Sequence, residues 1–430
     1  MKVTLLPGAA SGRVTIIPSK SHLHRLLILA SFADKPTLLR CEHSQAEDIQ
    51  ATIDCLSALG ARIEPRSEGF LVTPKGDSHL LGVLPCRESG STLRFMLPVV
   101  CALGLSGEFT MSGRLPERPL APLDKELIRH GIRLWRPNPN TLCCEGKLTA
   151  GDYTLPGTIS SQYISGLLLA LPLLEGNSTL TVEGPLESAD YITMTLQALE
   201  AFRFFIRDQG AGENNSYTIR GGVGFTSPGE IDVEGDWSNA AFWLCAGVMP
   251  GGNIEIAGLN RNSVQGDREI CAILERMGAR LKGDSHLLRV SEAEGSMPRR
   301  GVEIDARAIP DLVPVLCAVA AVSAGETIVT NAGRLRLKES DRLSATVQTL
   351  NALGAKVTEE PNGLRIQGVR RLSGGEVDAW GDHRIAMMAA IASLACEEPV
   401  IISGAQAVRK SYPAFWEKLL ALGKKIHIEE

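Results

Sequence analysis

A sixfold repeat is the feature of this 430-residue chain that most limits its fold. Six helical stretches carry apolar residues at i, i+3, i+4 and i+7 and end at positions 60, 131, 203, 278, 354 and 423, which lie 69 to 76 residues apart. Five of these positions are glycine and the sixth is Arg203. An apolar residue follows three positions after each: Ile63, Leu134, Ile206, Leu281, Val357 and Ile426. Because glycine commonly ends a helix, this regularity predicts a duplicated helix-then-strand unit.

Each unit holds a second helix that is apolar on every side, for example LLILASFA, YISGLLLALPLL and LVPVLCAVAAVSA. A helix without a polar face must be buried all round. A turn and a short strand follow it, as in GEFTMSG and NSTLTVEG. Six units in the order βαβα predict an α/β (α+β) protein of two domains, each with three units whose central helices are surrounded by sheets and outer helices.

The chain is expected to cross between the domains twice. The Gly- and Pro-rich stretch at 221–236 is one crossing, and the segment at 12–20 is the other. We predict a first domain over 20–228 and a second domain formed by 1–19 and 229–430. The N-terminal strand would join the second domain, and the active site would lie in the cleft between the two.

Composition excludes several classes of function. The net charge of −5 does not favour a general affinity for nucleic acid or membrane surfaces. No apolar stretch reaches the roughly 20 residues that a bilayer requires, and the N-terminus lacks the apolar core of a signal peptide. A soluble, cytoplasmic protein is expected. The ten cysteines show no metal-binding spacing, which predicts buried, reduced thiols.

Polar motifs stand at the start of the buried helices: SKSHLHR, ESGSTLR, ISSQ, DWSN, IPD and GDHR. Helix N-termini leave backbone amides without partners, so several of them opening toward one cleft would bind anions. The first motif adds Lys20 and Arg25 to the positive end of a helix. A polyanionic ligand between these two cations would neutralise their charge.

Several motifs in order resemble the EPSP synthase (3-phosphoshikimate 1-carboxyvinyltransferase) family: PSKSHLHR, ESGSTLR, ERP, SSQ, RLRLKESDR, GDHR and the late Lys410. The resemblance covers almost the whole chain. It implies a two-domain inverted α/β barrel (α/β prism) of six βαβαββ repeats. It also implies transfer of the enolpyruvyl group of phosphoenolpyruvate to the 5-hydroxyl of shikimate 3-phosphate, in aromatic amino acid biosynthesis. No metal or organic cofactor and no macromolecular partner is implied, and we expect a monomer.

The resemblance also assigns site residues. The set for phosphoenolpyruvate is Lys20, Gly90, Arg118, Gln162, Arg342, Arg384 and Lys410. The set for shikimate 3-phosphate is Lys20, Ser21, Arg25, Ser160, Ser161, Gln162, Ser188, Tyr191, Asp311 and Lys338. These substrates carry two phosphates and two carboxylates, so cationic side chains are needed to offset their repulsion.

The reaction requires one group that removes the hydroxyl proton and another that protonates the methylene carbon. Asp311 is the candidate for the first task. Glu339 is the candidate for the second, with Lys20 as rival or helper. The neighbouring charges of Lys338 and Arg342 favour the ionised form of Glu339, whereas bound anions and exclusion of water oppose that effect.

Each motif also has a purely structural interpretation. Ser160 or Asp311 taken singly is typical of a helix N-cap, and KESDR could be a solvated helix face with Lys338 and Arg342 at i, i+4. Gly90 could serve only a tight turn. Departures from the family pattern are Glu88 and Ser91 in ESGST, His22 and His24 in SKSHLHR, and Arg334. Glu88 is left out of the binding set, and Arg336 is a possible additional anion ligand.

Two other functions stay open at this point. One is the sister enolpyruvyl transferase that acts on UDP-N-acetylglucosamine, although GRLPERPLAP has no cysteine where that group often carries one. The other is a non-catalytic polyanion-binding relative, which would keep the cations but would have no use for Asp311 and Glu339.

Overall fold

The computed structural model describes residues 1–42, 46–76, 82–210, 214–284, 287–291 and 299–430. The chain forms two compact units: Pro18–Val233, called the first unit, and Met1–Ile17 with Glu234–Glu430, called the second unit. Each has its own hydrophobic core. The later boundary lies five residues beyond the predicted 228, because β14 (Glu230–Asp232) pairs in parallel with β3 (Thr37–Arg40) of the first unit.

Three four-stranded sheets build each unit. In the first unit, one sheet has the strand order β14-β3-β5-β4, where β5 is Gly69–Thr73 and β4 is Arg62–Arg66. The second has the order β6 (Val83–Arg87), β7 (Gly107–Met111), β9 (Thr141–Glu145) and β8 (Arg133–Asn138). The third has the order β10 (Asp152–Pro156), β11 (Ser178–Glu183), β13 (Asn215–Ile219) and β12 (Arg207–Asp208). In the second unit, one sheet has the order β2 (Ser11–Thr15), β15 (Asn253–Ala257), β17 (Leu287–Ser291) and β16 (Arg280–Gly283). The next has the order β18 (Glu303–Asp305), β19 (Glu326–Thr330), β21 (Gly363–Gln367) and β20 (Lys356–Glu360). The last has the order β22 (Gly375–Asp378), β23 (Val400–Ser403), β1 (Lys2–Leu5) and β24 (Ile426–Glu429). The first pair of each sheet is parallel and the other pairs are antiparallel.

The six apolar helices are the buried ones: α1 (Lys20–Ser31), α3 (Gly90–Ala102), α5 (Ser161–Ala170), α7 (Trp237–Val248), α9 (Val313–Ala320) and α11 (His383–Ala392). In α9 every residue is buried. Each of the other five is capped by a side-chain oxygen that accepts a hydrogen bond from a backbone N–H of the helix. The capping residues are Ser19, Ser89, Ser160, Asp236 and Asp382. Capping therefore satisfies amides that burial removes from water.

The outer helices are α2 (Glu47–Ala58), α4 (Leu123–Arg129), α6 (Ala189–Ala201), α8 (Ile270–Arg276), α10 (Arg342–Ala352) and α12 (Phe415–Ala421). Short 3-10 segments precede four of them: η1 (Leu115–Glu117), η3 (Gly266–Glu269), η5 (Gly333–Leu337) and η7 (Ala405–Lys410). Three more 3-10 turns adjoin the buried helices: η2 (Leu171–Leu173), η4 (Pro310–Leu312) and η6 (Ser393–Ala395). The predicted sixfold βαβαββ repeat is confirmed.

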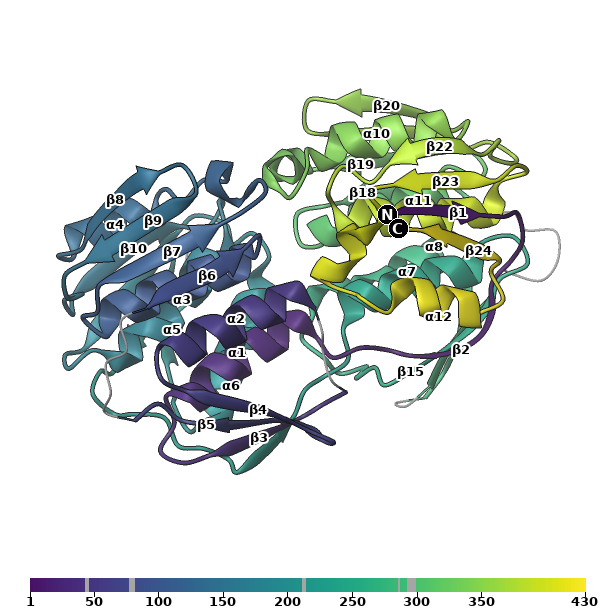
Figure 1. Ribbon diagram of the computed structural model, residues 1–430. Helices are drawn as coiled ribbons and strands as arrows, with labels where there is room; N and C mark the ends of the chain where they lie inside the picture. Colours follow the sequence, from purple (N-terminus) through teal and green to yellow (C-terminus); the bar gives the residue numbers. More distant parts are fainter. Residues whose placement is uncertain (43–45, 77–81, 211–213, 285–286, 292–298) are drawn as a thin grey trace. The chain divides into compact units, whose positions relative to one another are not determined.

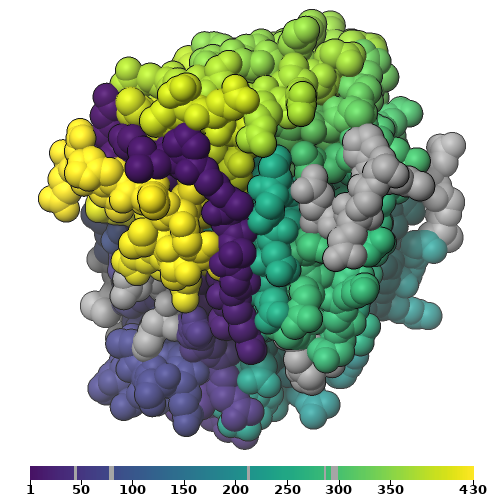
Figure 2. Space-filling model, turned by 90° about the vertical axis from the view of Figure 1, so that its right-hand side faces the viewer, coloured from purple at the N-terminus to yellow at the C-terminus, as the bar shows by residue number. Residues whose placement is uncertain are grey.

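The N-terminal strands belong to the second unit. β1 lies between β23 and β24 and is antiparallel to both, so the two chain ends lie side by side (Figure 1). β2 pairs with β15, and Figure 2 shows the purple N-terminal segment running along the surface beside teal and yellow parts of this unit. Each of these two sheets therefore contains strands from distant parts of the sequence.

The predicted helix ends share one backbone conformation. The five glycines at positions 60, 131, 278, 354 and 423 have φ between 89° and 98°, and Arg203 has φ of 61°. Glycine adopts this left-handed region freely, whereas other L-residues pay about 1–2 kcal/mol. Arg203 thus follows the repeat in conformation although it departs from it in sequence.

Arg203→Gly is expected to raise the free energy of unfolding by about 0.5–1 kcal/mol, because relief of the strained φ exceeds the added freedom of the unfolded chain. Denaturant unfolding of wild type and variant measures this. As a matched control, Gly423→Ala should lower stability by about 1 kcal/mol; a Cβ there meets no atom within 4 Å, so only the backbone is affected. Equal stability of Arg203→Gly and wild type would contradict the argument.

The ten cysteines are all free thiols, eight of them buried, and burial raises the pKa of Cys245 and Cys317. Among the described residues, no helix is long and apolar enough to cross a membrane.

Candidate active site

The predicted site residues come from two recurring places in the repeat. One is the first two turns of a buried helix, or the turn before it. The other is the segment that connects the second strand of a repeat to the start of its outer helix. The first unit carries Lys20, Ser21, Arg25, Gly90, Arg118, Ser160, Ser161, Gln162, Ser188 and Tyr191, and the second unit carries Asp311, Lys338, Glu339, Arg342, Arg384 and Lys410.

Arg342 is the centre of the charged cluster in the second unit. It is the first residue of α10 and only 1% exposed. Its Nη1 donates to Asp311 Oδ1 at 2.6 Å, its Nη2 to Glu339 Oε2 at 2.7 Å, and its Nε to Asp382 Oδ2 at 2.8 Å. Burial lowers the pKa of Arg342, but the three carboxylates more than reverse this effect and raise it. The guanidinium therefore serves three carboxylates at once.

Asp311 lies in η4, immediately before α9, and faces three cations. Besides Arg342, Lys338 Nζ lies 3.4 Å from its Oδ1 and Arg384 Nη2 lies 3.9 Å from its Oδ2. Burial alone would raise the pKa of Asp311, but the charges of Lys338, Arg384 and Arg342 hold it well below the usual value. Asp311 is therefore a carboxylate at neutral pH, which is the form that a general base requires. Its basicity depends on how far those three charges are neutralised.

Arg384 and Lys410 are tied to the same turn. Arg384 is the second residue of α11, and its backbone N–H donates to the capping carboxylate of Asp382 at 2.8 Å. Lys410, at the end of η7, donates from Nζ to the carbonyl of Gly381 at 2.6 Å. The guanidinium of Arg384 also lies 5.6 Å from the ring centroid of Phe242. These contacts place Arg384 beside Asp311 and Lys410 at the turn that precedes α11.

Asp382 belongs to this cluster but was not among the predicted site residues. Its side chain is fully buried, caps α11, and accepts hydrogen bonds from Arg342 Nε and from Ser340 Oγ at 3.0 Å. The GDHR motif contains it, and capping alone would explain its presence. Only its pairing with Arg342, 40 residues away in sequence, reveals the second task.

In the first unit Lys20 is paired with a carboxylate. Its Nζ lies 2.5 Å from Asp48 Oδ2, and both side chains are largely buried, at 18% and 16% exposed. Asp48 was not predicted. It lies in the first turn of α2, the same place in its repeat that carries the predicted residues in other repeats. Lys20 is therefore already in an ion pair before any ligand binds.

Arg25 is surrounded by protein acceptors. Its Nε donates to Thr195 Oγ1 at 2.7 Å, its Nη1 to the Ser21 carbonyl at 2.6 Å, and its Nη2 to Ser165 Oγ and the Tyr191 carbonyl at 3.2 and 3.0 Å. Burial lowers its pKa to about 10. A guanidinium has five N–H donors, so at most one remains for a ligand. Arg25 thus links the starts of α1 and α6.

Gly90 leaves room for two guanidinium groups. A Cβ added to it would contact Arg94 Nη1 and would lie 2.8 Å from Arg118 Nη1. Gln162 Nε2 donates to Ser91 Oγ at 2.9 Å, which joins the starts of α5 and α3. Gly90, Ser91, Arg118 and Gln162 therefore lie close together around the starts of α3 and α5. The close approach of Arg118 gives Gly90 a role beyond a tight turn.

The structural interpretations of single motifs have mixed outcomes. Ser160 does cap α5, with Gln162 N at 3.3 Å, whereas Asp311 bonds to cations and caps no helix. KESDR is not a solvated face, because Ser340 and Arg342 are buried and α10 begins only at Arg342.

The outcomes for the other unusual residues are as follows. Burial, then Lys20 and Arg25, lower the pKa of His24 well below its usual value, so it stays neutral and bonds to Thr52 Oγ1. Arg336 pairs with Glu359 at 2.5 Å and Asp341 at 3.1 Å. Two carboxylates thus engage Arg336 directly.

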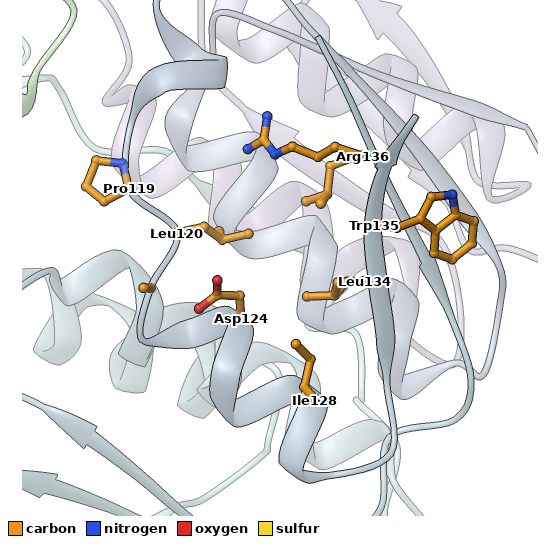
Figure 3. Close-up of a pocket in the computed structure, with 9 residues that line it drawn as sticks. Pro119, Leu120, Asp124, Ile128, Leu134, Trp135 and Arg136 are labelled. Carbon is orange, nitrogen blue, oxygen red and sulfur yellow. The ribbon is translucent and has the colours of Figure 1, made fainter. Parts of the chain in front are cut away.

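A pocket of about 380 Å³ in the first unit lies apart from these residues (Figure 3). Its lining is mainly apolar, and in the close-up Leu120, Leu134 and Ile128 lie below Arg136. None of the predicted substrate ligands lines it, although Pro119 follows Arg118 directly. Such a lining does not suit a site for small, multiply charged anions.

Comparisons with known proteins identify the family. The model of the family described as EPSP synthase (3-phosphoshikimate 1-carboxyvinyltransferase) matches residues 6–419. The 3-phosphoshikimate 1-carboxyvinyltransferase of Clostridium kluyveri is 40% identical over 99% of this chain and 98% of its own length. That of Clostridium acetobutylicum is 41% identical, with the same two coverages.

Solved structures agree in fold. The EPSP synthase of Acinetobacter baumannii superposes with a TM-score of 0.79 at 26% identity, covering 100% of both chains. An enolpyruvyl transferase of Streptomyces tendae has the same TM-score at 20% identity, covering 99% of this chain and 98% of its own. The predicted two-domain α/β fold of six repeats is confirmed, and the chain is a member of the EPSP synthase family.

Proposed function

We propose that this protein transfers the enolpyruvyl group of phosphoenolpyruvate to the 5-hydroxyl of shikimate 3-phosphate and releases phosphate. The observation that carries the proposal is the position of Asp311, a partly buried carboxylate within hydrogen-bonding or ion-pair range of Lys338, Arg342 and Arg384. A base among cations suits a reaction in which anions bind and a hydroxyl proton leaves. Family membership supports the same choice.

Substrate binding would raise the basicity of Asp311. In the free protein its pKa is low because three cations face it. A phosphate on Lys338 and the carboxylate or phosphate of phosphoenolpyruvate on Arg384 would offset two of those charges, and exclusion of water would strengthen the effect. Asp311 then accepts the hydroxyl proton while the oxygen attacks the phosphate-bearing carbon of phosphoenolpyruvate and the methylene carbon takes up a proton. The tetrahedral adduct then loses phosphate from the first carbon and a proton from the second, which restores the double bond.

Protonation of the methylene carbon falls to Glu339 or Lys20. Glu339 accepts a hydrogen bond from Arg342 at 2.7 Å, which favours its ionised form. Lys20 is paired with Asp48.

Turnover with both substrates tests the proposed function. Phosphate release should occur with phosphoenolpyruvate and shikimate 3-phosphate, and should not occur when UDP-N-acetylglucosamine is the acceptor. Release only with the nucleotide sugar would favour the sister transferase. Binding of both anions without any release would favour a non-catalytic relative.

Gly90→Ala is expected to raise the KM for phosphoenolpyruvate by about tenfold or more, because a small misplacement of a binding group has large effects. The added methyl group would displace Arg118, whose Nη1 lies 2.8 Å from its position. The KM for shikimate 3-phosphate should change less. Steady-state kinetics measures both.

Gly82→Ala is the matched control, since a Cβ there meets only Ala58 Cβ at an ordinary 3.6 Å. It should leave both constants unchanged. An unchanged KM for phosphoenolpyruvate in Gly90→Ala would show that Arg118 does not bind this substrate or that it readily relocates.

A further inference from the structure

Five of the six repeats supply at least one predicted site residue, and the fourth supplies none. In that repeat the start of the buried helix carries Ser238, in α7, and the segment before the outer helix carries Asp267, in η3. The equivalent segments of other repeats carry Arg118, Lys338 and Lys410. The fold therefore brings Ser238 and Asp267 to places that hold functional groups elsewhere.

Asp267 is a buried carboxylate that lacks a full set of partners. It is 4% exposed, and within the part of the chain that the structure describes its Oδ2 accepts no hydrogen bond. Burial of such a group is costly unless something compensates it. An exposed position would avoid this cost, so its burial points to a task beside the charged cluster.

The backbone that carries Asp267 is anchored to the start of α7. Gln265 Nε2 donates to the Gly235 carbonyl at 2.9 Å, and Gln265 Oε1 accepts from Trp237 N at 3.1 Å. These two bonds hold η3 against the turn that precedes Ser238. Asp267 lies two residues after Gln265, so these bonds hold in place the backbone from which its side chain extends.

Ser238 lies between Arg384 and Asp267. Its Oγ accepts from Arg384 Nη2 at 2.5 Å, and its carbonyl accepts from Arg384 Nη1 at 2.9 Å. Because this oxygen accepts from Arg384, its single proton is available to the neighbouring carboxylate of Asp267, whose pKa Ser238 lowers. Asp267 can therefore orient the hydroxyl that holds Arg384.

We propose that Asp267 is a positioning residue that, through the hydroxyl of Ser238, holds the guanidinium of Arg384 in the orientation that receives phosphoenolpyruvate. This inference rests on the proposed function. Asp267 itself touches no substrate. It acts on the anion site by fixing the direction of two N–H donors, and its negative charge opposes part of the charge of Arg384.

The protonation of Asp267 follows from its surroundings. Asp311 from η4, Arg384 from α11, and Ser238 and Asp236 at the start of α7 all act on it. Burial, Asp311 and Asp236 raise the pKa of Asp267 to about 7, against the opposite influence of Arg384 and Ser238. An anion bound at Arg384 adds negative charge nearby and favours the protonated form. Binding of phosphoenolpyruvate should therefore be accompanied by proton uptake at Asp267.

Direct binding of phosphoenolpyruvate, measured by calorimetry on the full chain, tests the proposal without relying on turnover. Asp267→Ala should raise the Kd about tenfold, as expected for loss of a hydrogen bond to a charged pair. Its kcat should change by less than about threefold, because Asp311 remains in place. Asp267→Asn keeps an oxygen that accepts from Ser238, so its Kd should stay within about twofold of wild type near neutral pH.

Two further readouts separate positioning from a merely structural role. Ser238→Ala should raise the Kd for phosphoenolpyruvate about as much as Asp267→Ala does. The Kd of the double variant should not exceed the larger of the two single-variant values, since both changes remove the same support of Arg384. The ratio of Kd between wild type and Asp267→Asn should change between about pH 6 and about pH 8.5, because only the wild type can take up the proton. Glu126→Gln, an equally buried carboxylate of the first unit that accepts from Thr154 N at 2.6 Å, is the control and should change neither quantity.

The proposal fails if Asp267→Ala binds phosphoenolpyruvate as tightly as wild type or more tightly. Asp267 would then act only as a charge that opposes the anion. Additive effects of the Asp267 and Ser238 variants would also overturn it. These outcomes differ from failure of the proposed function, in which the wild type itself would neither turn over nor bind phosphoenolpyruvate.

Discussion

Asp311→Asn is expected to lower kcat by about 10²- to 10⁴-fold, the usual contribution of a general base. Asparagine has nearly the same shape and keeps an oxygen toward Arg342 Nη1, which lies 2.6 Å from Asp311 Oδ1. It cannot accept the hydroxyl proton. The affinity for shikimate 3-phosphate should change little, because Lys338 and Ser160 remain. Kinetics together with calorimetric binding separates these two effects.

Asp311→Glu provides a control that keeps the charge and the basicity but moves the carboxylate. Partial activity of this variant, above that of Asp311→Asn, is expected. If Asp311→Asn turned over at the rate of wild type, Asp311 would be only a structural partner of Arg342, and the proposed role as base would be wrong. Loss of binding together with turnover would instead assign it to ligand recognition.

Arg342→Met is expected to lower the free energy of unfolding of the second unit by about 3–5 kcal/mol, the cost of removing one partner from a buried ionic network. Arg342 is 1% exposed and donates to Asp311, Glu339 and Asp382. The variant leaves these three carboxylates close together without their shared cation. Denaturant unfolding, followed by a probe in the second unit, measures the loss.

Arg365→Met is the matched control. Arg365 also contacts two carboxylates, Glu326 at 2.8 Å and Glu360 at 3.0 Å, but its side chain is 42% exposed. Exposed pairs contribute about 0–1 kcal/mol, so this variant should be nearly as stable as wild type. Equal losses in both variants would mean that burial of the Arg342 network carries no special cost.

The destabilisation by Arg342→Met should also depend on pH. In the wild type the pKa of Asp311 is held well below its usual value, so its stabilising contribution is present above about pH 4 and is lost as pH falls through the folded-state pKa. Without Arg342 the carboxylates become easier to protonate. The difference between variant and wild type should therefore be largest at neutral pH and shrink in acid.

Local patterns in the sequence were sufficient for the repeat and for the buried helices. Apolar runs without a polar face predicted burial of α9 and α11, and five glycines predicted where outer helices end. Even the exception, Arg203, adopts the left-handed conformation of these glycines, at φ of 61°. Such features depend on residues close together in the chain, so a sequence displays them directly.

Pairings between distant elements could not be predicted in the same way. Lys20 contacts Asp48 across 28 positions, and Arg342 contacts Asp382 across 40. Nothing near Asp48 or Asp267 in the chain reveals the cation that each faces. Three of the four internal acceptors of Arg25 come from α5 and α6, up to 170 positions away. A charged residue was therefore visible in the sequence, but whether a ligand or the protein satisfies it was not.

The place of β1 has a consequence for synthesis of the chain. The first unit is continuous from Pro18 to Val233, so all its strands are synthesised before the second unit resumes at Glu234. β1 is made before any of them, yet its neighbours β23 and β24 begin at Val400 and Ile426. Pairing across so much chain is slow. β1 is thus made before the first unit but is paired only long after that unit is complete, and until then it is an unprotected edge exposed to aggregation.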